Sequence, residues 1–166
     1  TLPQADSAIV DYTKMMGGHI TYREDGLYVR GGRSEIPITL DLSDSPDLLP
    51  VLAVMAALRP STTILKGVAH ARLKESDRVG ALAFQLTKLG VDVEELEDGL
   101  IIRGREKLEG GVTLDSYNDH RLFMAFTALR LACKRGVTVL GAESADVSYP
   151  NFLDDLKACG GKVKSL

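Results

Sequence analysis

EDGLYVRG at residues 24–31 is repeated as EDGLIIRG at residues 97–104, and this repeat indicates the fold of the 166-residue chain. Three other stretches repeat at a similar spacing: KMMG at 14–17 with KLG at 88–90, TLD at 39–41 with TLD at 113–115, and TILKG at 63–67 with TVLG at 138–141. A period of about 74 residues is typical of folds that stack like units. We therefore expect one domain over 1–166, with full units at about 5–67 and 79–141 and a partial third unit at 149–166.

Each unit is predicted to contain a helix, three strands, a second helix and a last strand. The first helix has one apolar stripe and ends at Gly17 or Gly90, which take a left-handed cap position. A hairpin follows, with its turn at Asp25-Gly26 or Asp98-Gly99. The predicted strands are 19–23, 27–30, 36–42 and 62–66 in the first unit, and 91–96, 100–103, 112–114 and 137–140 in the second.

The second helix of each unit, at 48–58 and 122–129, is apolar on nearly every face. A helix of this kind must be buried on all sides. The sequence therefore predicts an α/β fold of repeated units, with these helices inside and the sheets around them.

Composition narrows the function classes. The formal net charge of -3 provides no basic surface for nucleic acid, and no apolar run reaches the roughly 18 residues of a membrane span. The two cysteines, Cys133 and Cys159, lack metal-type spacing, so both are expected to be small core residues in a reducing compartment. We expect a cytoplasmic protein. Because the sequence has no Cys/His cluster and no Gly-rich phosphate loop, we expect it to bind no metal and no cofactor.

Three polar loops precede predicted helices: SDSPD at 43–47, KESDR at 74–78 and NDHR at 118–121. Like units place their equivalent loops at the same end of a domain, and a helix N-terminus attracts anions. Lys74, Arg78 and Arg121 add positive charge there, suited to phosphate and carboxylate. The carboxylates among them indicate acid–base chemistry on a phosphorylated small molecule.

A purely structural reading stays open for part of this pattern. Asp47 and Asp77 could be acids that favour a first helical turn, and Ser45 or Ser76 could be simple caps. His120 and the arginine after it are harder to explain in this way, because they precede a wholly apolar helix.

The two remaining histidines have different surroundings. His19 lies in a predicted strand and is expected to have no role in function. His70 follows a strand just before the KESDR loop and could face the same cleft.

At this point the motifs resemble a known family. ARLKESDR at 71–78 resembles the R-x-K-E-[ST]-[DE]-R signature of the 5-enolpyruvylshikimate-3-phosphate synthases (3-phosphoshikimate 1-carboxyvinyltransferases), and YNDHRLFMAF at 117–126 resembles their second signature. Pro46-Asp47 and SYPNF at 148–152 are similar to two further family motifs. The resemblance implies an inside-out α/β barrel of enolpyruvyl transferase type, in which this chain is one incomplete, C-terminal domain and an N-terminal domain is missing.

The resemblance also implies a reaction and its two catalytic groups. Enzymes of this family transfer the enolpyruvyl group of phosphoenolpyruvate to the 5-hydroxyl of shikimate 3-phosphate and release phosphate. Asp47 matches the residue that contacts the shikimate hydroxyl and accepts its proton. Glu75 matches the residue that protonates the methylene carbon of phosphoenolpyruvate.

The substrate-binding residues follow from the same resemblance. Lys74 matches a lysine at shikimate 3-phosphate, Arg78 and Arg121 match cations that hold phosphoenolpyruvate, and His120 matches a histidine beside them. His70 stands where some members have an asparagine that contacts shikimate 3-phosphate. Val147 stands where some members have a lysine, so that cation is missing here.

Two alternatives compete with this interpretation. The UDP-N-acetylglucosamine enolpyruvyl transferases share the fold, but they lack the KESDR run and the histidine of DHR. A catalytically silent binding or interaction domain is the other alternative. Because one face of the implied site is missing, we expect little turnover by the 166 residues alone, and we expect association through the apolar flank left uncovered by the partial repeat.

Overall fold

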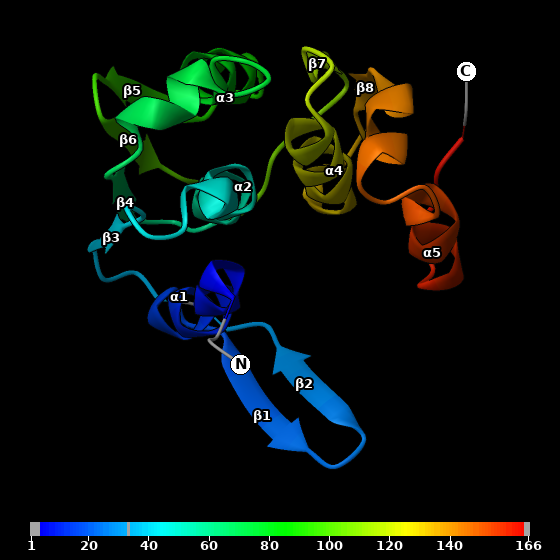
Figure 1. The fold of residues 1–166 in the computed structure, drawn as a ribbon, viewed down its shortest axis with the longest axis horizontal. Helices are drawn as coiled ribbons and strands as arrows, with labels where there is room; N and C mark the ends of the chain where they lie inside the picture. Colours follow the sequence, from blue (N-terminus) through cyan, green and yellow to red (C-terminus); the bar gives the residue numbers. More distant parts are fainter. Residues whose placement is uncertain (1–3, 33, 165–166) are drawn as a thin grey trace.

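The computed structural model describes residues 4–32 and 34–164 (Figure 1). Within them, one order of α-helices and strands occurs twice. The first set is η1 (Ala5–Ala8), α1 (Ile9–Met15), β1 (His19–Arg23), β2 (Gly26–Arg30), β3 (Ile38–Asp41), η2 (Pro46–Leu48), α2 (Leu49–Ala57) and β4 (Thr62–Lys66). The second set is η3 (Ala69–Leu73), α3 (Arg78–Lys88), β5 (Asp92–Leu96), β6 (Gly99–Arg103), β7 (Thr113–Asp115), α4 (His120–Leu129), η4 (Arg130–Ala132) and β8 (Thr138–Leu140). The short helices η5 (Ala142–Val147) and α5 (Phe152–Ala158) follow.

The second hairpin completes a sheet that the first set begins. Strands β3 and β4 run parallel, and β6 pairs antiparallel with β4, which gives the order β3-β4-β6-β5. The hairpin β1–β2 and the parallel pair β7–β8 form two-stranded sheets of their own. Figure 1 shows the β1–β2 hairpin projecting from the body of the molecule.

The two predicted apolar helices pack together in the interior, but only α2 is buried on nearly every side, because α4 exposes Ala128 and partly exposes Met124. In α2 only Val51 and Met55 are less than fully buried, and α4 packs directly against α2. The proline at position 50 fits because the first turn of a helix needs no N–H donor there. The fold is therefore the predicted mixed α/β arrangement, with the two apolar helices inside and the sheets outside.

The hairpin turns lie one residue earlier than predicted. Strand β1 ends at Arg23 and β2 begins at Gly26, so the glycine is the first residue of a strand instead of part of the turn. Gly99 has the same place in β6. A Cβ atom on Gly99 would overlap the carbonyl oxygen of Leu65, so glycine is required there by the close approach of β4.

The prediction for the cysteines is half correct. Cys133 is buried, and its thiol donates a hydrogen bond to the carbonyl of Leu129 at 3.5 Å. Cys159 is exposed, so its prediction as a core residue is wrong. It directly follows α5, a short helix with no fully buried residue. Across the described residues, no helix combines the length and the apolar character that crossing a membrane requires.

Candidate active site

Arg78 joins the three polar loops. It is the first residue of α3, and its side chain is only 1% exposed. Its Nε donates to Oδ2 of Asp119 at 2.7 Å, its Nη1 to Oδ1 of Asp47 at 2.8 Å and its Nη2 to Oε2 of Glu75 at 2.7 Å. One buried cation thus holds a carboxylate from each loop, and the three loops meet at one place.

Asp119 is the fully buried partner in this cluster. As the N-cap of α4, its Oδ1 accepts hydrogen bonds from the backbone N–H groups of Arg121 at 2.9 Å and Leu122 at 3.3 Å. Burial raises the pKa of Asp119, but its hydrogen bond and charge interaction with Arg78 and these backbone bonds outweigh burial and lower the pKa below its usual value. Ser76 donates to its Oδ2 at 3.1 Å. Asp119 therefore remains ionised and fixes the start of α4 against Arg78.

Asp47 is surrounded by three cations. Its Oδ1 lies 2.8 Å from Nη1 of Arg78 and 3.6 Å from Nζ of Lys74, and its Oδ2 lies 3.1 Å from Nη2 of Arg121. Its side chain is 31% exposed. Partial burial raises the pKa of Asp47, but Arg121, Lys74 and Arg78 together lower it below its usual value. The carboxylate is therefore ionised at neutral pH and open to solvent on one side.

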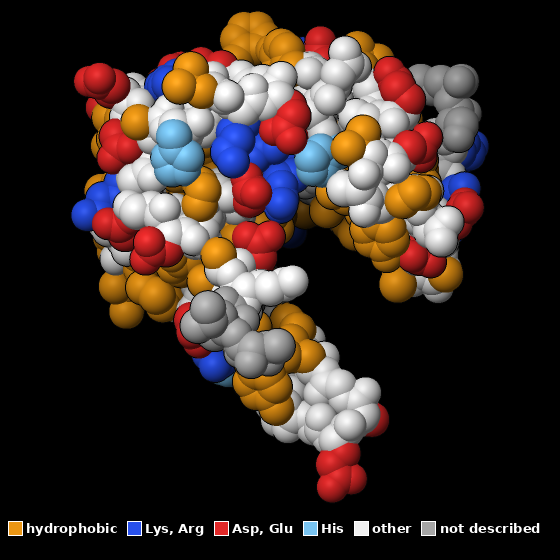
Figure 2. Space-filling model, in the orientation of Figure 1, with side chains coloured by type: hydrophobic (Ala, Val, Ile, Leu, Met, Phe, Trp, Pro, Cys, Tyr) orange, Lys and Arg blue, Asp and Glu red, His pale blue; other side chains and the backbone are white. Residues whose placement is uncertain are grey.

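Glu75 belongs to this cluster, whereas no described contact joins His70 or His120 to it. Glu75 is half exposed, and its only ion pair in the described chain is the one with Arg78. His120 begins α4 and is partly exposed, whereas His70 is exposed on η3. Neither histidine has a hydrogen bond or ion pair to the described cluster residues. Figure 2 shows Lys and Arg side chains gathered near the centre of this face with acidic side chains beside them, between the part that holds α2 and α3 and the part that holds α4.

Of the two acids that could have a purely structural role, Asp77 has one. Asp77 is the N-cap of α3, accepts from the N–H of Gly80 at 3.0 Å, and lies 3.0 Å from Nη1 of Arg72. Neither predicted serine cap acts as one: Ser45 has no capping bond, and the hydroxyl of Ser76 bonds to Asp119 instead.

Sequence reasoning missed Asp119 as a member of the cluster. An acid before an apolar helix signals a cap, and that signal was present. The ion pair with Arg78, 41 residues away, leaves no local pattern.

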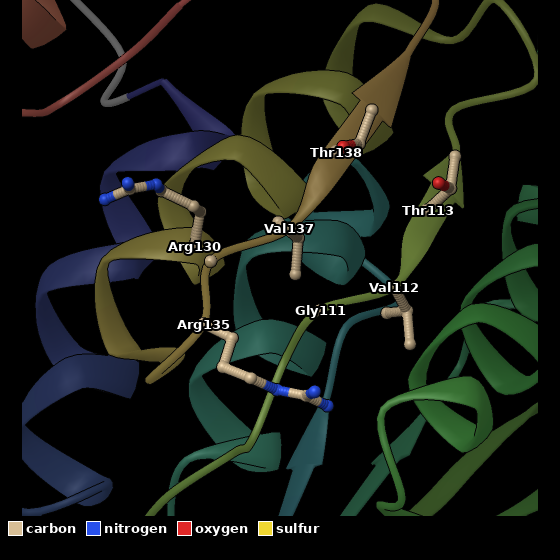
Figure 3. A pocket seen from close by; sticks show the side chains of 8 residues that line it. Gly111, Val112, Thr113, Arg130, Arg135, Val137 and Thr138 are labelled. Carbon is tan, nitrogen blue, oxygen red and sulfur yellow. The ribbon is translucent and has the colours of Figure 1, made fainter.

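A separate surface hollow lies between the ends of β7 and β8. It has a volume of about 260 Å³ and is lined in part by Arg130, Arg135 and Gly111. Figure 3 shows Arg130 on the helical segment at the end of α4 and Arg135 on the loop before β8, and Arg135 donates to the carbonyl of Gly110 at 3.3 Å. None of the predicted site residues lines this hollow, so the cluster around Asp47 is the candidate site. Among the described residues, no group of three or more His, Cys, Asp or Glu side chains could hold a metal ion.

Comparison with known proteins agrees with these motifs. The family model described as EPSP synthase (3-phosphoshikimate 1-carboxyvinyltransferase) matches residues 1–156. Relatives named 3-phosphoshikimate 1-carboxyvinyltransferase are 45% identical in Clostridium acetobutylicum and 44% in Korarchaeum cryptofilum, over 96% and 99% of this chain. The chain spans only 36% and 38% of the length of these two relatives.

Solved structures similar to this chain belong to the same family. An EPSP synthase from Acinetobacter baumannii superimposes with a TM-score of 0.85 at 26% identity, over 98% of this chain and 41% of that one. A second structure of EPSP synthase from the same organism gives a TM-score of 0.81.

Proposed function

This chain belongs to the EPSP synthase family, and from this we propose that it supplies one face of a site for enolpyruvyl transfer. The two substrates are phosphoenolpyruvate and shikimate 3-phosphate, and the products are the enol ether and inorganic phosphate. The observation that carries the proposal is the Asp47 carboxylate held among Arg78, Lys74 and Arg121 at the meeting point of the three loops.

Asp47 is the proposed proton acceptor. In the free chain its pKa is low because three cations surround it, so it is a weak base. The phosphate and carboxylate groups of bound substrates would compete for Lys74 and Arg121, which are both partly exposed. Since each neutralised cation removes a term that lowers the pKa, substrate binding raises the basicity of Asp47 at the step that needs it.

Glu75 is the proposed acid. It gives its proton to the methylene carbon of phosphoenolpyruvate, and the adjacent carbon becomes an electrophile that the shikimate 5-hydroxyl oxygen attacks. The hydroxyl proton passes to Asp47, which gives a tetrahedral adduct. Glu75 then takes a proton back from the new methyl group as the carbon–oxygen bond to phosphate breaks, which restores the double bond in the product, and the proton held by Asp47 leaves with the phosphate. The half-exposed position of Glu75 leaves it accessible to a substrate.

The family resemblance implies that Arg78 binds phosphoenolpyruvate, and this proposal adds that Arg78 positions the two catalytic carboxylates. Its side chain is buried and donates to three carboxylates, so it fixes Asp47 and Glu75 relative to each other. Because the Arg78 side chain is only 1% exposed, phosphoenolpyruvate can contact its guanidinium only if a neighbouring side chain moves. Arg121 and Lys74 therefore make the first contacts with the anionic groups. His120 borders the phosphoenolpyruvate side and His70 the shikimate 3-phosphate side.

A silent binding domain is the second candidate. The chain spans little more than a third of the length of its relatives, and the site groups proposed to contact substrate are partly or fully exposed. Because these residues supply only one face of the proposed site, we expect the isolated 166 residues to leave both substrates unchanged.

The test is a chimaera. Residues 1–166 replace the matched segment of the Clostridium acetobutylicum relative, and phosphorus NMR follows shikimate 3-phosphate and phosphoenolpyruvate. We expect signals from inorganic phosphate and from a new phosphorylated enol ether. Asp47→Asn in the chimaera should abolish these signals, and Asp44→Asn is its matched control, because Asp44 is an exposed acid of the same loop and should leave turnover intact. A folded chimaera with unchanged substrate signals would favour the silent domain.

A further inference from the structure

The segment between β4 and α3, residues 67–77, carries Lys74 and Glu75, but its own structure provides little to hold them in place. Its regular element is the short 3-10 helix η3, and residues 74–76 after it form an irregular bend. Hydrogen bonds in a 3-10 helix have poorer geometry than those in an α-helix. The backbone that places Lys74 and Glu75 must therefore be fixed by contacts with other parts of the molecule.

The turn of the β5–β6 hairpin fixes the beginning of this segment. Oδ1 of Asp98 accepts a hydrogen bond from the N–H of Ala69 at 2.8 Å, and Oδ2 accepts one from the N–H of Gly67 at 3.0 Å. The bonds from Ala69 and Gly67 lower the pKa of Asp98 below its usual value, so its carboxylate is ionised at neutral pH. Figure 1 shows the hairpin beside α3, which packs against β5. The hairpin is therefore a fixed support for the segment.

Arg72 joins the end of the segment to the same hairpin. Its Nη2 donates to the carbonyl of Leu96 at 2.7 Å, and its Nε donates to the carbonyl of Glu97 at 3.1 Å. Its Nη1 lies 2.8 Å from Oε1 of Glu95. The same Nη1 donates to both carboxylate oxygens of Asp77, at 3.2 Å and 3.0 Å. One guanidinium group thus connects β5, the hairpin turn and the N-cap of α3.

The ion pair between Arg72 and Asp77 closes a short loop of residues 73–76, called the 73–76 loop below. This loop carries Lys74 and Glu75, whose side chains are 36% and 49% exposed, so their own packing restrains them only weakly. A loop that is already fixed in its bound shape costs less free energy to order when a ligand binds. The Arg72–Asp77 ion pair can provide this restraint.

The surroundings of Arg72 favour a positioning role over direct contact with a substrate. Each of its three side-chain nitrogens has a partner within the described chain. Its side chain is 24% exposed, and the carboxylates of Asp77 and Glu95 balance its charge. Burial lowers the pKa of Arg72, but the hydrogen bond to Glu95 and the charges of Asp77 and Glu95 outweigh burial and raise the pKa. Arg72 is therefore a permanent cation that is engaged with the protein itself.

We propose that Arg72 is a positioning residue for the 73–76 loop. It holds the loop on the β5–β6 hairpin so that Lys74 and Glu75 keep their places in the cluster around Asp47. This inference rests on the proposed function, because Lys74 and Glu75 are the reacting and binding groups whose positions Arg72 sets. Arg72 acts through these two groups and needs no contact with either substrate.

Arg72→Lys in the chimaera with the Clostridium acetobutylicum relative tests the catalytic consequence. Lysine keeps the positive charge, but its single ammonium group cannot replace a planar guanidinium that contacts two carbonyls and two carboxylates. We expect kcat to fall about tenfold or more, because Glu75 is no longer held where it can donate its proton. The KM for shikimate 3-phosphate should rise, because Lys74 moves with the loop. The KM for phosphoenolpyruvate should stay nearly unchanged, because Arg121 lies on α4.

Arg103→Lys is the matched control. Arg103 lies on β6 of the same hairpin and pairs with Asp92 at 3.5 Å and Glu94 at 3.3 Å, and none of its described contacts reaches residues 67–77. This variant should keep kcat and both KM values. If Arg72→Lys has the kcat of the control, the role of Arg72 is only structural and the proposal is wrong. An inactive unsubstituted chimaera would instead overturn the proposed function.

A measurement without turnover tests the positioning itself. Nitrogen-15 relaxation of the 166-residue chain gives backbone order parameters, which are about 0.85 for a rigid backbone and below about 0.6 for a flexible one. We expect rigid values for the 73–76 loop in the natural chain and in Arg103→Lys, and flexible values in Arg72→Lys. An equally rigid loop in all three proteins would refute the proposal, whether or not the chimaera is active.

Discussion

The starts of the two buried helices occupy equivalent places but carry opposite charges. Asp47 precedes α2 and Arg121 lies in the first turn of α4, and the two residues are 74 positions apart, which is the repeat period. They also meet, with Oδ2 of Asp47 3.1 Å from Nη2 of Arg121. A repeated fold thus brings the same position of two units together, and the difference between the side chains gives one the proposed role of base and the other that of anion-binding cation.

The two helix starts also differ in how they are fixed. The α4 start is held by Asp119, which is 0% exposed and both caps the helix and pairs with Arg78. The α2 start has no side-chain cap, and the 3-10 turn η2 with Pro46 at its first position leads into the helix. The buried interactions that stabilise the fold are therefore at the start of α4, whereas the partly exposed carboxylate of Asp47 is at the start of α2.

Removal of Asp119 should have the largest effect on stability. Asp119→Ala leaves Arg78 buried without its fully buried partner and uncaps α4, so we expect a loss of about 3–5 kcal/mol in the free energy of unfolding. Urea unfolding followed by circular dichroism measures it.

Asp77→Ala is the matched control for Asp119→Ala. Asp77 also caps a helix, but it is half exposed and its charge partner Arg72 retains Glu95. We expect a loss of about 1 kcal/mol from the cap alone. Similar losses for the two variants would mean that the buried pair adds nothing beyond capping.

Asp47 should dominate activity and contribute little to stability. In the chimaera, Asp47→Asn should lower kcat by about 100-fold or more, as expected when a positioned proton acceptor is lost. The unfolding midpoint should change much less than in Asp119→Ala, because Asp47 is partly exposed. Full turnover by Asp47→Asn would remove it from the proposed mechanism.

Much of the fold could be predicted because the repeat and the alternation of residues are local signals. Strands β1 and β4 begin and end at the predicted residues, and both interior helices follow from their lack of a polar face. The turns were predicted one residue late because a glycine after an acid looks like a turn residue, whereas Gly99 is needed for its contact with Leu65. That contact is a property of the assembled sheet.

The candidate site could be predicted only in part. The three loops meet because like units place equivalent loops at one end, and Arg78 contacts all three. The central position of Arg78 among the site residues could not be predicted, because it depends on burial. Arg78 is 1% exposed, although a KESDR run looks like a solvent-exposed helix start.

The pair formed by the two equivalent positions can be tested by a double-mutant cycle. Asp47→Asn, Arg121→Gln and the double variant should give a coupling energy of about 0.5–1 kcal/mol, because both side chains are about one-third exposed. Urea midpoints of the four proteins provide the values. A coupling near zero would mean that the two residues are neighbours without a stabilising interaction.

The smallest expected effect is the pH dependence of that pair. The folded-state pKa of Asp47 lies below the ordinary 3.8, because Arg121, Lys74 and Arg78 favour its charged form despite burial. A lowered pKa adds stability that is present above the ordinary value and is lost as the pH falls through the folded-state pKa. The difference in unfolding free energy between the natural chain and Asp47→Asn should therefore be constant near neutral pH and shrink below about pH 4. Asp44→Asn is the control, and a difference that instead grew as the pH fell would contradict the placement of this carboxylate among three cations.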